Sequence, residues 1–204
     1  MEKFITFEGG EGAGKSTLLN LLKDYLDKNN IDYVATREPG GTDECEKIRE
    51  FVLKSKGISP LSQFLLFSAS RSILVDKVIA PSLKQGKIVL CDRYFDSSRV
   101  YQGYCDELND NDICCITNFA TNGLIPYITF YLDIDPEVAF KRKQQIDKTD
   151  VFETKNLDFH NKVRQGFLNL AKQEPNRFVV IDATKSQQEI LDIVINVLKE
   201  KGVL

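Results

Sequence analysis

Near its start the chain reads Gly9-Gly10-Glu11-Gly12-Ala13-Gly14-Lys15-Ser16, which matches the pattern G-x-x-x-x-G-K-[ST] in full. The apolar run Phe4 to Phe7 precedes this stretch, and residues 15–28 follow it with leucines spaced along one helical face. A strand, a glycine-rich loop and a helix in this order direct backbone N–H groups at a bound phosphate. The sequence therefore predicts a phosphate-binding loop at residues 9–17, ending at Thr17.

The residue types of this loop have chemical reasons. Glycines permit positive φ and a close approach of the backbone to an anion. Lys15 is placed to neutralise the β- and γ-phosphates of ATP, and the Ser16 hydroxyl to bind Mg²⁺. The guanine-reading pattern [NT]-K-x-D is missing, since Asn161-Lys162-Val163-Arg164 ends in arginine. These features favour ATP and Mg²⁺ over the GTP of a signalling GTPase.

Four further apolar runs alternate with longer helical stretches, which predicts an α/β fold. The runs are Ile31 to Thr36, Ile88 to Cys91, Ile128 to Leu132 and Phe178 to Ile181. They are continuous rather than alternating, as in parallel strands that are buried on both faces. Helix starts are indicated by Asp135-Pro136 and by the capping-box spacing of Ser186 and Glu189. We expect a five-stranded parallel sheet with helices on both faces, in a single domain over residues 1–204.

The net charge and the lengths of the apolar runs argue against nucleic acid and membranes as partners. The 204 residues carry a formal net charge of −3, which argues against nucleic acid as a partner. No apolar run approaches the roughly 20 residues of a membrane-spanning helix. Residues 1–5 lack the layout of a signal peptide, so we expect a cytoplasmic location and no membrane association.

The cysteines and the histidine bear on metal sites. The five cysteines are Cys45, Cys91, Cys105, Cys114 and Cys115; the number is odd and no C-x-x-C pair occurs. We therefore expect free thiols that pack as small apolar groups rather than a disulfide framework or a zinc site. His160 is the sole histidine, which disfavours a histidine-based metal site, and we expect it on a helix surface.

Three polar segments are expected near the phosphate loop. Arg37-Glu38-Pro39-Gly40-Gly41-Thr42 directly follows the second predicted strand, and Asp92-Arg93-Tyr94 directly follows the third. A basic cluster, Lys141-Arg142-Lys143, has Lys148 nearby. Ligands of such sheets bind beyond the carboxyl ends of the strands, so each segment is a candidate for the binding edge.

The chain closely resembles bacterial thymidylate kinase from Phe4 to about Leu198. The stretches that carry the resemblance are Phe7-Glu8-Gly9 through Thr17, Thr36-Arg37-Glu38-Pro39-Gly40-Gly41-Thr42, Leu65-Leu66-Phe67-Ser68-Ala69-Ser70-Arg71, Asp92-Arg93-Tyr94 through Tyr101-Gln102-Gly103, Tyr131-Leu132-Asp133 with Pro136-Glu137, and Ile181-Asp182-Ala183-Thr184. Many families share the phosphate loop, whereas the R-E-P-G-G-T and D-R-Y…Y-Q-G stretches together are far more specific.

This resemblance implies a fold and an activity. The fold is the P-loop type of the nucleoside monophosphate kinases, with a short lid at about residues 141–153. The activity is transfer of the γ-phosphate of ATP to dTMP, giving dTDP and ADP for dTTP synthesis. Mg²⁺ is the implied cofactor, and the implied assembly is a homodimer.

For the base and sugar, the resemblance assigns five residues. Phe67 matches the aromatic residue on which thymine stacks, and Arg71 the donor to a thymine carbonyl. Ser98 and Gln102 stand where the family makes further contacts with the base. Tyr101 matches the tyrosine beneath the deoxyribose, where a ribose 2′-hydroxyl would be crowded.

For the phosphates and the metal, the resemblance assigns another set. Arg37 and Arg93 match arginines near the acceptor phosphate, and Asp92 matches the acid close to Mg²⁺. Glu11 matches the acidic loop residue that faces the sugar and metal region. Together with Lys15 these residues are expected to offset the repulsion between two polyanions, which is the main task of phosphoryl-transfer catalysis.

The lid departs from the family pattern. Members with an acidic loop residue, such as Glu11, usually supply a lid arginine from a D-R-x-E stretch, but here that stretch reads Asp150-Val151-Phe152-Glu153. Arg142 is the one arginine of residues 141–153. We therefore expect Arg142 to contact the transferring phosphoryl group. Lys143 or Lys148 would be weaker helpers, since lysine lacks the planar fork of arginine.

Two alternatives remain at this stage. One is a P-loop kinase with another small acceptor, such as a deoxynucleoside or guanylate kinase, which the R-E-P-G-G-T segment disfavours. The other is a protein that binds ATP without kinase activity.

Overall fold

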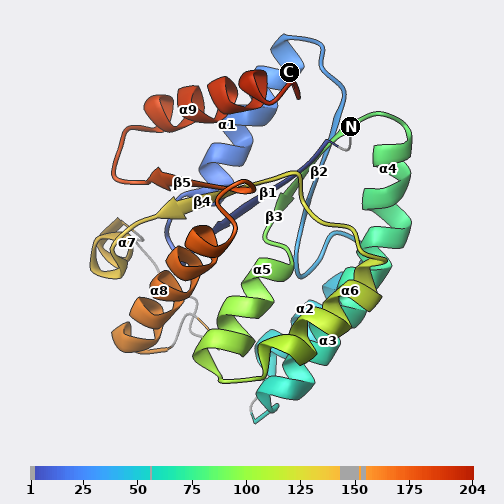
Figure 1. Cartoon of the computed structure of the whole chain (residues 1–204), viewed down its shortest axis with the longest axis vertical. Helices are drawn as coiled ribbons and strands as arrows, with labels where there is room; N and C mark the ends of the chain where they lie inside the picture. The colour runs from blue at the N-terminus through green and yellow to red at the C-terminus, as the bar shows by residue number, and fades with distance from the viewer. Residues whose placement is uncertain (1–2, 56, 143–151, 153–154) are drawn as a thin grey trace.

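A computed structural model of the chain describes residues 3–55, 57–142, 152 and 155–204. Their strands form one parallel sheet in the order β2-β3-β1-β4-β5 (Figure 1). The strands are β1 Phe4–Gly9, β2 Tyr33–Arg37, β3 Ile88–Asp92, β4 Ile128–Asp133 and β5 Phe178–Asp182. The predicted five-stranded parallel sheet is confirmed.

The strands differ from the prediction at their ends. β2 begins at Tyr33 instead of Ile31, and all five strands continue past their apolar runs. At the carboxyl edge the ladder pairs Arg37 with Asp92, and Asp133 with Asp182. Backbone pairing extends the strands there, and polar side chains at these positions tolerate it because the edge opens toward solvent.

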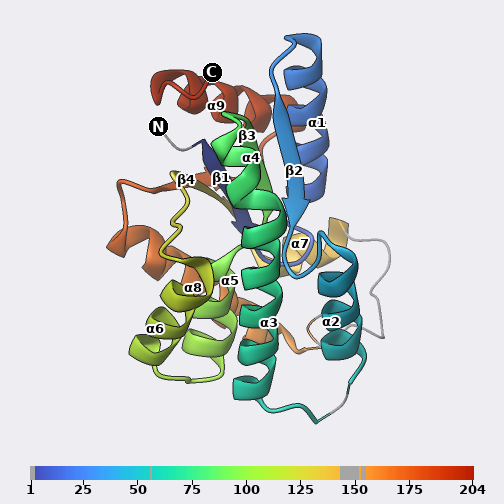
Figure 2. The ribbon, with the colours of Figure 1, turned by 90° about the vertical axis from the view of Figure 1, so that its right-hand side faces the viewer.

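Helices cover both faces of the sheet, as predicted. In Figure 1, α1 and α9 lie above the sheet, and α8, α5, α3 and α6 lie below it; in Figure 2, α1 and α9 are again in the upper part of the molecule and the other four helices in the lower part. The helices are α1 Lys15–Lys28, α2 Asp43–Lys54, α3 Pro60–Leu74, α4 Ala80–Lys84, α5 Phe95–Ser98, α6 Asp110–Thr121, α7 Pro136–Arg142, α8 Leu157–Gln173 and α9 Gln187–Glu200, with π-helical segments η1 Val75–Ile79 and η2 Arg99–Cys105. Within the described residues, no helix is both long and apolar enough to cross a membrane.

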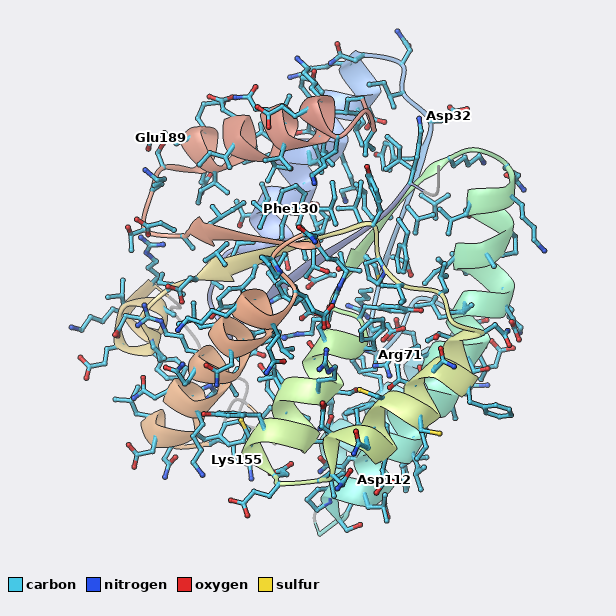
Figure 3. The ribbon with its side chains drawn as sticks, in the orientation of Figure 1. Asp32, Arg71, Asp112, Phe130, Lys155 and Glu189 are labelled. Atoms are coloured by element: carbon cyan, nitrogen blue, oxygen red, sulfur yellow. The ribbon has the colours of Figure 1, made fainter. Side chains whose placement is uncertain are left out.

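The main core lies between the sheet and the layer formed by α1 and α9. Phe7 of β1 stacks on Phe130 of β4, with ring centroids 5.6 Å apart. Leu22 of α1 and Val194 of α9 are fully buried against them. Phe130 is labelled within this layer in Figure 3. Burial of such side chains contributes about 1.5–3 kcal/mol each and fixes α1, hence the loop before it, on the sheet.

Helix starts follow the sequence signals. The Ser186 hydroxyl caps α9 by accepting the Glu189 N–H, and the Glu189 carboxylate accepts the Ser186 N–H. The predicted capping box is therefore present. Thr42 caps α2 through the Cys45 N–H. α1 has no side-chain cap, because Gly14 precedes it in a left-handed conformation. The N–H groups of its first turn are therefore directed into the phosphate loop.

The expectation for His160 was wrong, and the expectation for the cysteines is confirmed in part. His160 is buried, with 4% of its surface exposed, because its ring packs edge-on against Phe140 and Phe159. The cysteines are all free, but only Cys45, Cys91 and Cys105 are buried; Cys114 and Cys115 lie exposed on α6.

Candidate active site

A cleft of about 680 Å³ opens at the carboxyl edge of the sheet. It is lined by the loops after β1, β2 and β3 and by residues of α3 and η2. Of the predicted site residues that the structure describes, all but Gly9 and Gly10 line it: Glu11, Gly12, Ala13, Gly14, Lys15, Ser16, Thr17, Arg37, Phe67, Arg71, Asp92, Arg93, Ser98, Tyr101, Gln102 and Arg142. Residues as distant in the sequence as Glu11 and Ile190, 179 positions apart, thus share one cavity.

The phosphate loop packs tightly beneath α7. Gly12 and Gly14 have φ of 73° and 93°, which glycine adopts without strain. A Cβ atom on Gly12 would lie 2.9 Å from the carbonyl oxygen of Ala139. The glycine at position 12 is therefore required both by the backbone conformation and by the close approach of α7.

Lys15 lies over the loop. Its Nζ donates to the carbonyl oxygens of Gly9 and Gly10 at 3.1 Å each, and only 8% of the residue is exposed. Burial, and the nearby positive charge of Arg93, hold the pKa of Lys15 below its usual value. An anionic phosphate in the loop would satisfy this charge better than two carbonyl groups do.

Arg93 occupies the middle of the cleft. It is a non-glycine residue with φ of 66°, a conformation that costs about 1–2 kcal/mol. Its Nη2 lies 2.6 Å from Oε1 of Glu11, and its guanidinium stands over the Tyr101 ring, 5.4 Å from the centroid. Burial opposes its charge, but the attraction of Tyr101, Glu11 and Glu8 outweighs that cost and raises the pKa of Arg93.

A second group of arginines stands on the wall beside α2. Arg37 Nη2 donates to both carboxylate oxygens of Glu46, at 2.9 Å to Oε1 and 2.8 Å to Oε2. Glu46 Oε1 also accepts the Gly41 N–H. Arg49 donates to the Pro39 carbonyl oxygen at 3.0 Å and lines the cleft too. Sequence reasoning missed Arg49, since an arginine on an exposed amphipathic helix carries no distinguishing signal.

The deep end of the cleft is aromatic and polar. Phe67, Ser98, Tyr101 and Gln102 are buried there, on α3, α5 and η2. Arg71 is labelled in Figure 3 among the helices below the sheet, and 3% of it is exposed.

Arg71 is held by two partners. Its Nε donates to Glu38 Oε2 at 2.7 Å and its Nη2 to Ser98 Oγ at 3.1 Å. Within the described residues, Arg71 Nη1 and Gln102 Nε2 have no hydrogen-bond partner although both are buried. Burial raises the pKa of Glu38 to about 7 against the opposing effect of Arg71. An unpartnered buried donor costs about 1–3 kcal/mol, which a ligand carbonyl would recover.

Glu8 is a further buried carboxylate that sequence reasoning left without a role. Its two oxygens accept the Tyr94 N–H at 2.8 Å and the Ser97 hydroxyl at 2.7 Å. Burial raises its pKa to about 7. The available signal was an acidic residue inside an otherwise apolar strand, Phe4 to Gly9.

Part of the predicted lid falls outside the described residues, including Lys143, Lys148 and Val151. Arg142, at the end of α7, donates to the carbonyl oxygens of Ala183 and Thr184 at 2.7 and 3.4 Å. Phe152 lies near two predicted acceptor residues, with its ring centroid 6.4 Å from that of Phe67 and 5.5 Å from that of Tyr101.

The residues predicted for the metal have suitable donor atoms. Ser16 is exposed at the first turn of α1, and Asp92 ends β3. Asp92 Oδ1 is buried and has no hydrogen-bond partner among the described residues. A hydroxyl and a carboxylate oxygen beside a phosphate loop are the ligands that Mg²⁺ takes in such sites. The residues present therefore fit this ion.

A parallel sheet, a complete phosphate loop and a cleft that continues from this loop across the sheet edge define a P-loop phosphotransferase of the nucleoside monophosphate kinase type. The thymidylate kinase family model matches residues 7–194. The chain belongs to the thymidylate kinase family, phosphotransferases that use ATP to phosphorylate dTMP.

Individual relatives agree with this assignment. The chain is 48% identical over 192 residues to a thymidylate kinase of Dehalococcoides mccartyi, covering 93% of this chain and 92% of the relative. It is 45% identical over 193 residues to that of Kosmotoga olearia, covering 94% and 93%. The crystal structure of thymidylate kinase from Ehrlichia chaffeensis superposes with a TM-score of 0.79 at 37% identity, covering 96% and 97%.

Proposed function

We propose that the cleft holds ATP on residues 9–17 and dTMP at its deep end, with Arg93 between the two phosphates. The observation that carries this proposal is the position of Arg93. It contacts Glu11 of the phosphate loop on one side and Tyr101 of the deep end on the other. A cation there meets both polyanions and lowers their mutual repulsion.

At the donor end, the loop amides and Lys15 bind the β- and γ-phosphates. Mg²⁺ would be held by Ser16 and Asp92, and when bound it supplies positive charge to the phosphate oxygens. Glu11 faces this region and keeps Arg93 near the loop until a phosphate replaces it. The dTMP phosphate is already anionic near neutral pH, so the chain needs no strong general base.

At the acceptor end, Phe67 provides a stacking face for thymine and Arg71 donates to a thymine carbonyl. Both lie on α3, four residues apart and therefore on one helix face. Ser98 and Gln102 complete the polar contacts with the base. Tyr101 lies beneath the deoxyribose and crowds a 2′-hydroxyl.

The phosphate of dTMP lies toward Arg37 and Arg93, with Arg49 on the same wall. Arg142 contacts the transferring phosphoryl group. In this structure Arg142 bonds to the carbonyls after β5, so that role requires the side chain to leave Ala183 and Thr184.

We also propose a homodimer through α2, α3 and α6, and a cytoplasmic location where ATP is supplied. These three helices pack side by side (Figure 2). They expose large apolar side chains: Phe51, Leu61, Leu65 and Phe119, the last with 86% of its surface exposed. Phe119→Glu should convert a dimer into a monomer in analytical ultracentrifugation, and an unchanged mass would contradict this interface.

The experiment that tests the function is a coupled assay of ADP release from ATP, run with and without each nucleoside monophosphate. We expect release that depends on dTMP. Release that depends on another monophosphate points to a different acceptor, and ATP binding without release points to a binding protein. Lys15→Ala serves as the control for contaminating kinases, because it must lose the activity.

A further inference from the structure

The peptide bond between Arg93 and Tyr94 is held at both of its polar ends by buried side chains. Its N–H, on Tyr94, donates to Glu8 Oε1 at 2.8 Å. Its carbonyl oxygen, on Arg93, accepts from Cys91 Sγ at 3.0 Å. A strained backbone conformation persists only where its surroundings over-determine it, and these two bonds fix the peptide plane beside the left-handed Arg93.

The same carboxylate also reaches the Arg93 side chain. Ser97 Oγ donates to Glu8 Oε2 at 2.7 Å and accepts from Arg93 Nη1 at 3.3 Å. Glu8 thus ends a chain of hydrogen bonds that starts at the guanidinium. The other branch of the guanidinium, Nη2, meets Glu11 at 2.6 Å. Backbone and side chain of Arg93 are therefore both tied to one residue of β1.

A glutamate at position 8 lowers the stability of the folded state. It is fully buried, and burial together with Asp96 raises its pKa, so a charged Glu8 disfavours folding. Glutamine has the same shape and would be buried at lower cost. Cys91 is fully buried too, and its Sγ lies 3.0 Å from the Arg93 carbonyl oxygen, the distance of an S–H donor. Packing explains a small apolar group at position 91, but it explains neither this contact nor a carboxylate at position 8.

We propose that Glu8 and Cys91 are positioning residues that clamp the Arg93–Tyr94 peptide and thereby direct the Arg93 guanidinium toward the phosphates. This inference rests on the proposed role of Arg93. Neither residue touches a nucleotide; each acts through Arg93. The clamp accounts for one cysteine and for the acidic residue in the first strand.

Glu8→Gln tests one side of the clamp. The amide oxygen can still accept the Tyr94 N–H, but the amide nitrogen cannot accept from the Ser97 hydroxyl, so the chain from Arg93 loses its terminal acceptor and its negative charge. We expect kcat/KM for dTMP to fall about tenfold or more, as for a lost hydrogen bond to a charged group. The dissociation constant of ATP should stay within about twofold. At pH 8 the variant should be at least as stable as the wild type.

Cys91→Ala and Cys91→Ser test the other side as a matched pair, and they keep the proposal testable if Glu8→Gln does not fold. Alanine loses the donor, so kcat/KM for dTMP should fall several-fold. Serine retains a donor and should restore most of the loss. A purely structural role for Cys91 predicts that both variants lose activity in proportion to their loss of stability.

Two controls separate the outcomes. Ile195→Val, in the core on α9, lowers stability without touching the clamp and gives the kinetic effect of stability alone. Arg93→Ala tests the proposed function itself. If Arg93→Ala is slow while Glu8→Gln and Cys91→Ala match the wild type, the clamp is overturned and the role of Arg93 stands. If Arg93→Ala turns over at the wild-type rate, both are overturned.

Discussion

Glu38 and Arg71 form a buried ion pair, with 2.7 Å between Glu38 Oε2 and Arg71 Nε. The pair orients a planar donor whose Nη1 is left without a partner in the described part of the chain. We expect Arg71→Ala to weaken dTMP ten- to a hundredfold, because a hydrogen bond from a charged donor contributes about 1.5–3 kcal/mol. ATP affinity should not change.

Isothermal titration with each nucleotide checks this prediction. Thermal unfolding of the same sample shows whether the variant is folded, since Glu38 loses its partner. Equal weakening of both nucleotides, in a folded variant, would remove Arg71 from the acceptor site.

Lys15→Ala should reduce turnover by more than about a hundredfold and leave the fold intact. The change removes a charge at the γ-phosphate, where preorganised cations are worth several kcal/mol in the transition state. Circular dichroism and steady-state turnover are the measurements, with Lys28→Ala, exposed at the other end of α1, as the matched control. Near-normal turnover of Lys15→Ala contradicts the mechanism.

Arg142→Ala should lower turnover on the order of a thousandfold, as for other arginines supplied to a transferring phosphoryl group, with little change in ATP affinity. Single-turnover kinetics of Arg142→Ala and Lys148→Ala are compared, with the neighbouring, exposed Lys141→Ala as control. If Arg142→Ala instead binds ATP more weakly and turns over normally, the arginine serves the nucleotide end near Ala183. Arg93 is then the main arginine at the phosphoryl group.

Asp92→Asn should raise the Mg²⁺ concentration needed for half-maximal turnover at least about tenfold, because a charged oxygen ligand is lost. Asp133→Asn is the control: Asp133 also ends a strand of this sheet, but its carboxylate bonds Arg164 at 2.8 Å. Equal Mg²⁺ requirements in wild type and Asp92→Asn would place the ion elsewhere.

Glu8 gives folding stability an unusual pH dependence. Its pKa rises from 4.5 to about 7 on folding, because burial and Asp96 outweigh the attraction of Arg93. Between these values the folded state retains a proton that the unfolded state has released. This contribution to stability is therefore full below pH 4.5, falls as pH rises and is lost above about 7.

Urea unfolding from about pH 4.5 to about 8 tests this sign. The stability of Glu8→Gln relative to wild type should increase across that window, by on the order of 3 kcal/mol at most, and level off above it. Acids with lowered pKa values, such as Glu189, change the free energy of unfolding of both proteins equally, so their contribution cancels in the difference. A constant difference would contradict the raised pKa of Glu8.

Local signals in the sequence were sufficient for the fold. Each strand is a short apolar run, and the loop of residues 9–16 fixes the first crossover. Capping residues such as Ser186 mark helix starts. Prediction failed at the strand ends, because ladder pairs such as Arg37 with Asp92 depend on a neighbouring strand rather than on local composition.

The sequence predicted those cleft residues that belong to a recognisable motif. It did not predict residues that reach the cleft only through long-range contacts. Among the described residues, the cleft brings together all but two of those predicted for the site, and the variants above test their roles in catalysis. Glu8 and Arg49 were missed: Glu8 meets Ser97 across 89 positions. His160 was misplaced because helical periodicity alone could not show which aromatic side chains would enclose it.

Four cations of this cleft already have oxygen partners. Lys15 has two loop carbonyls, Arg37 has Glu46, Arg93 has Glu11, and Arg142 has the carbonyl of Ala183. An incoming anion must therefore exchange partners rather than simply add to a bare positive surface. A lone inorganic phosphate can displace the two carbonyls on Lys15, but it reaches few of the other cations, whereas a nucleotide spans several of them and exchanges more partners at once. We therefore expect the cleft to prefer nucleotides to small anions by the number of partners exchanged, without a steric barrier.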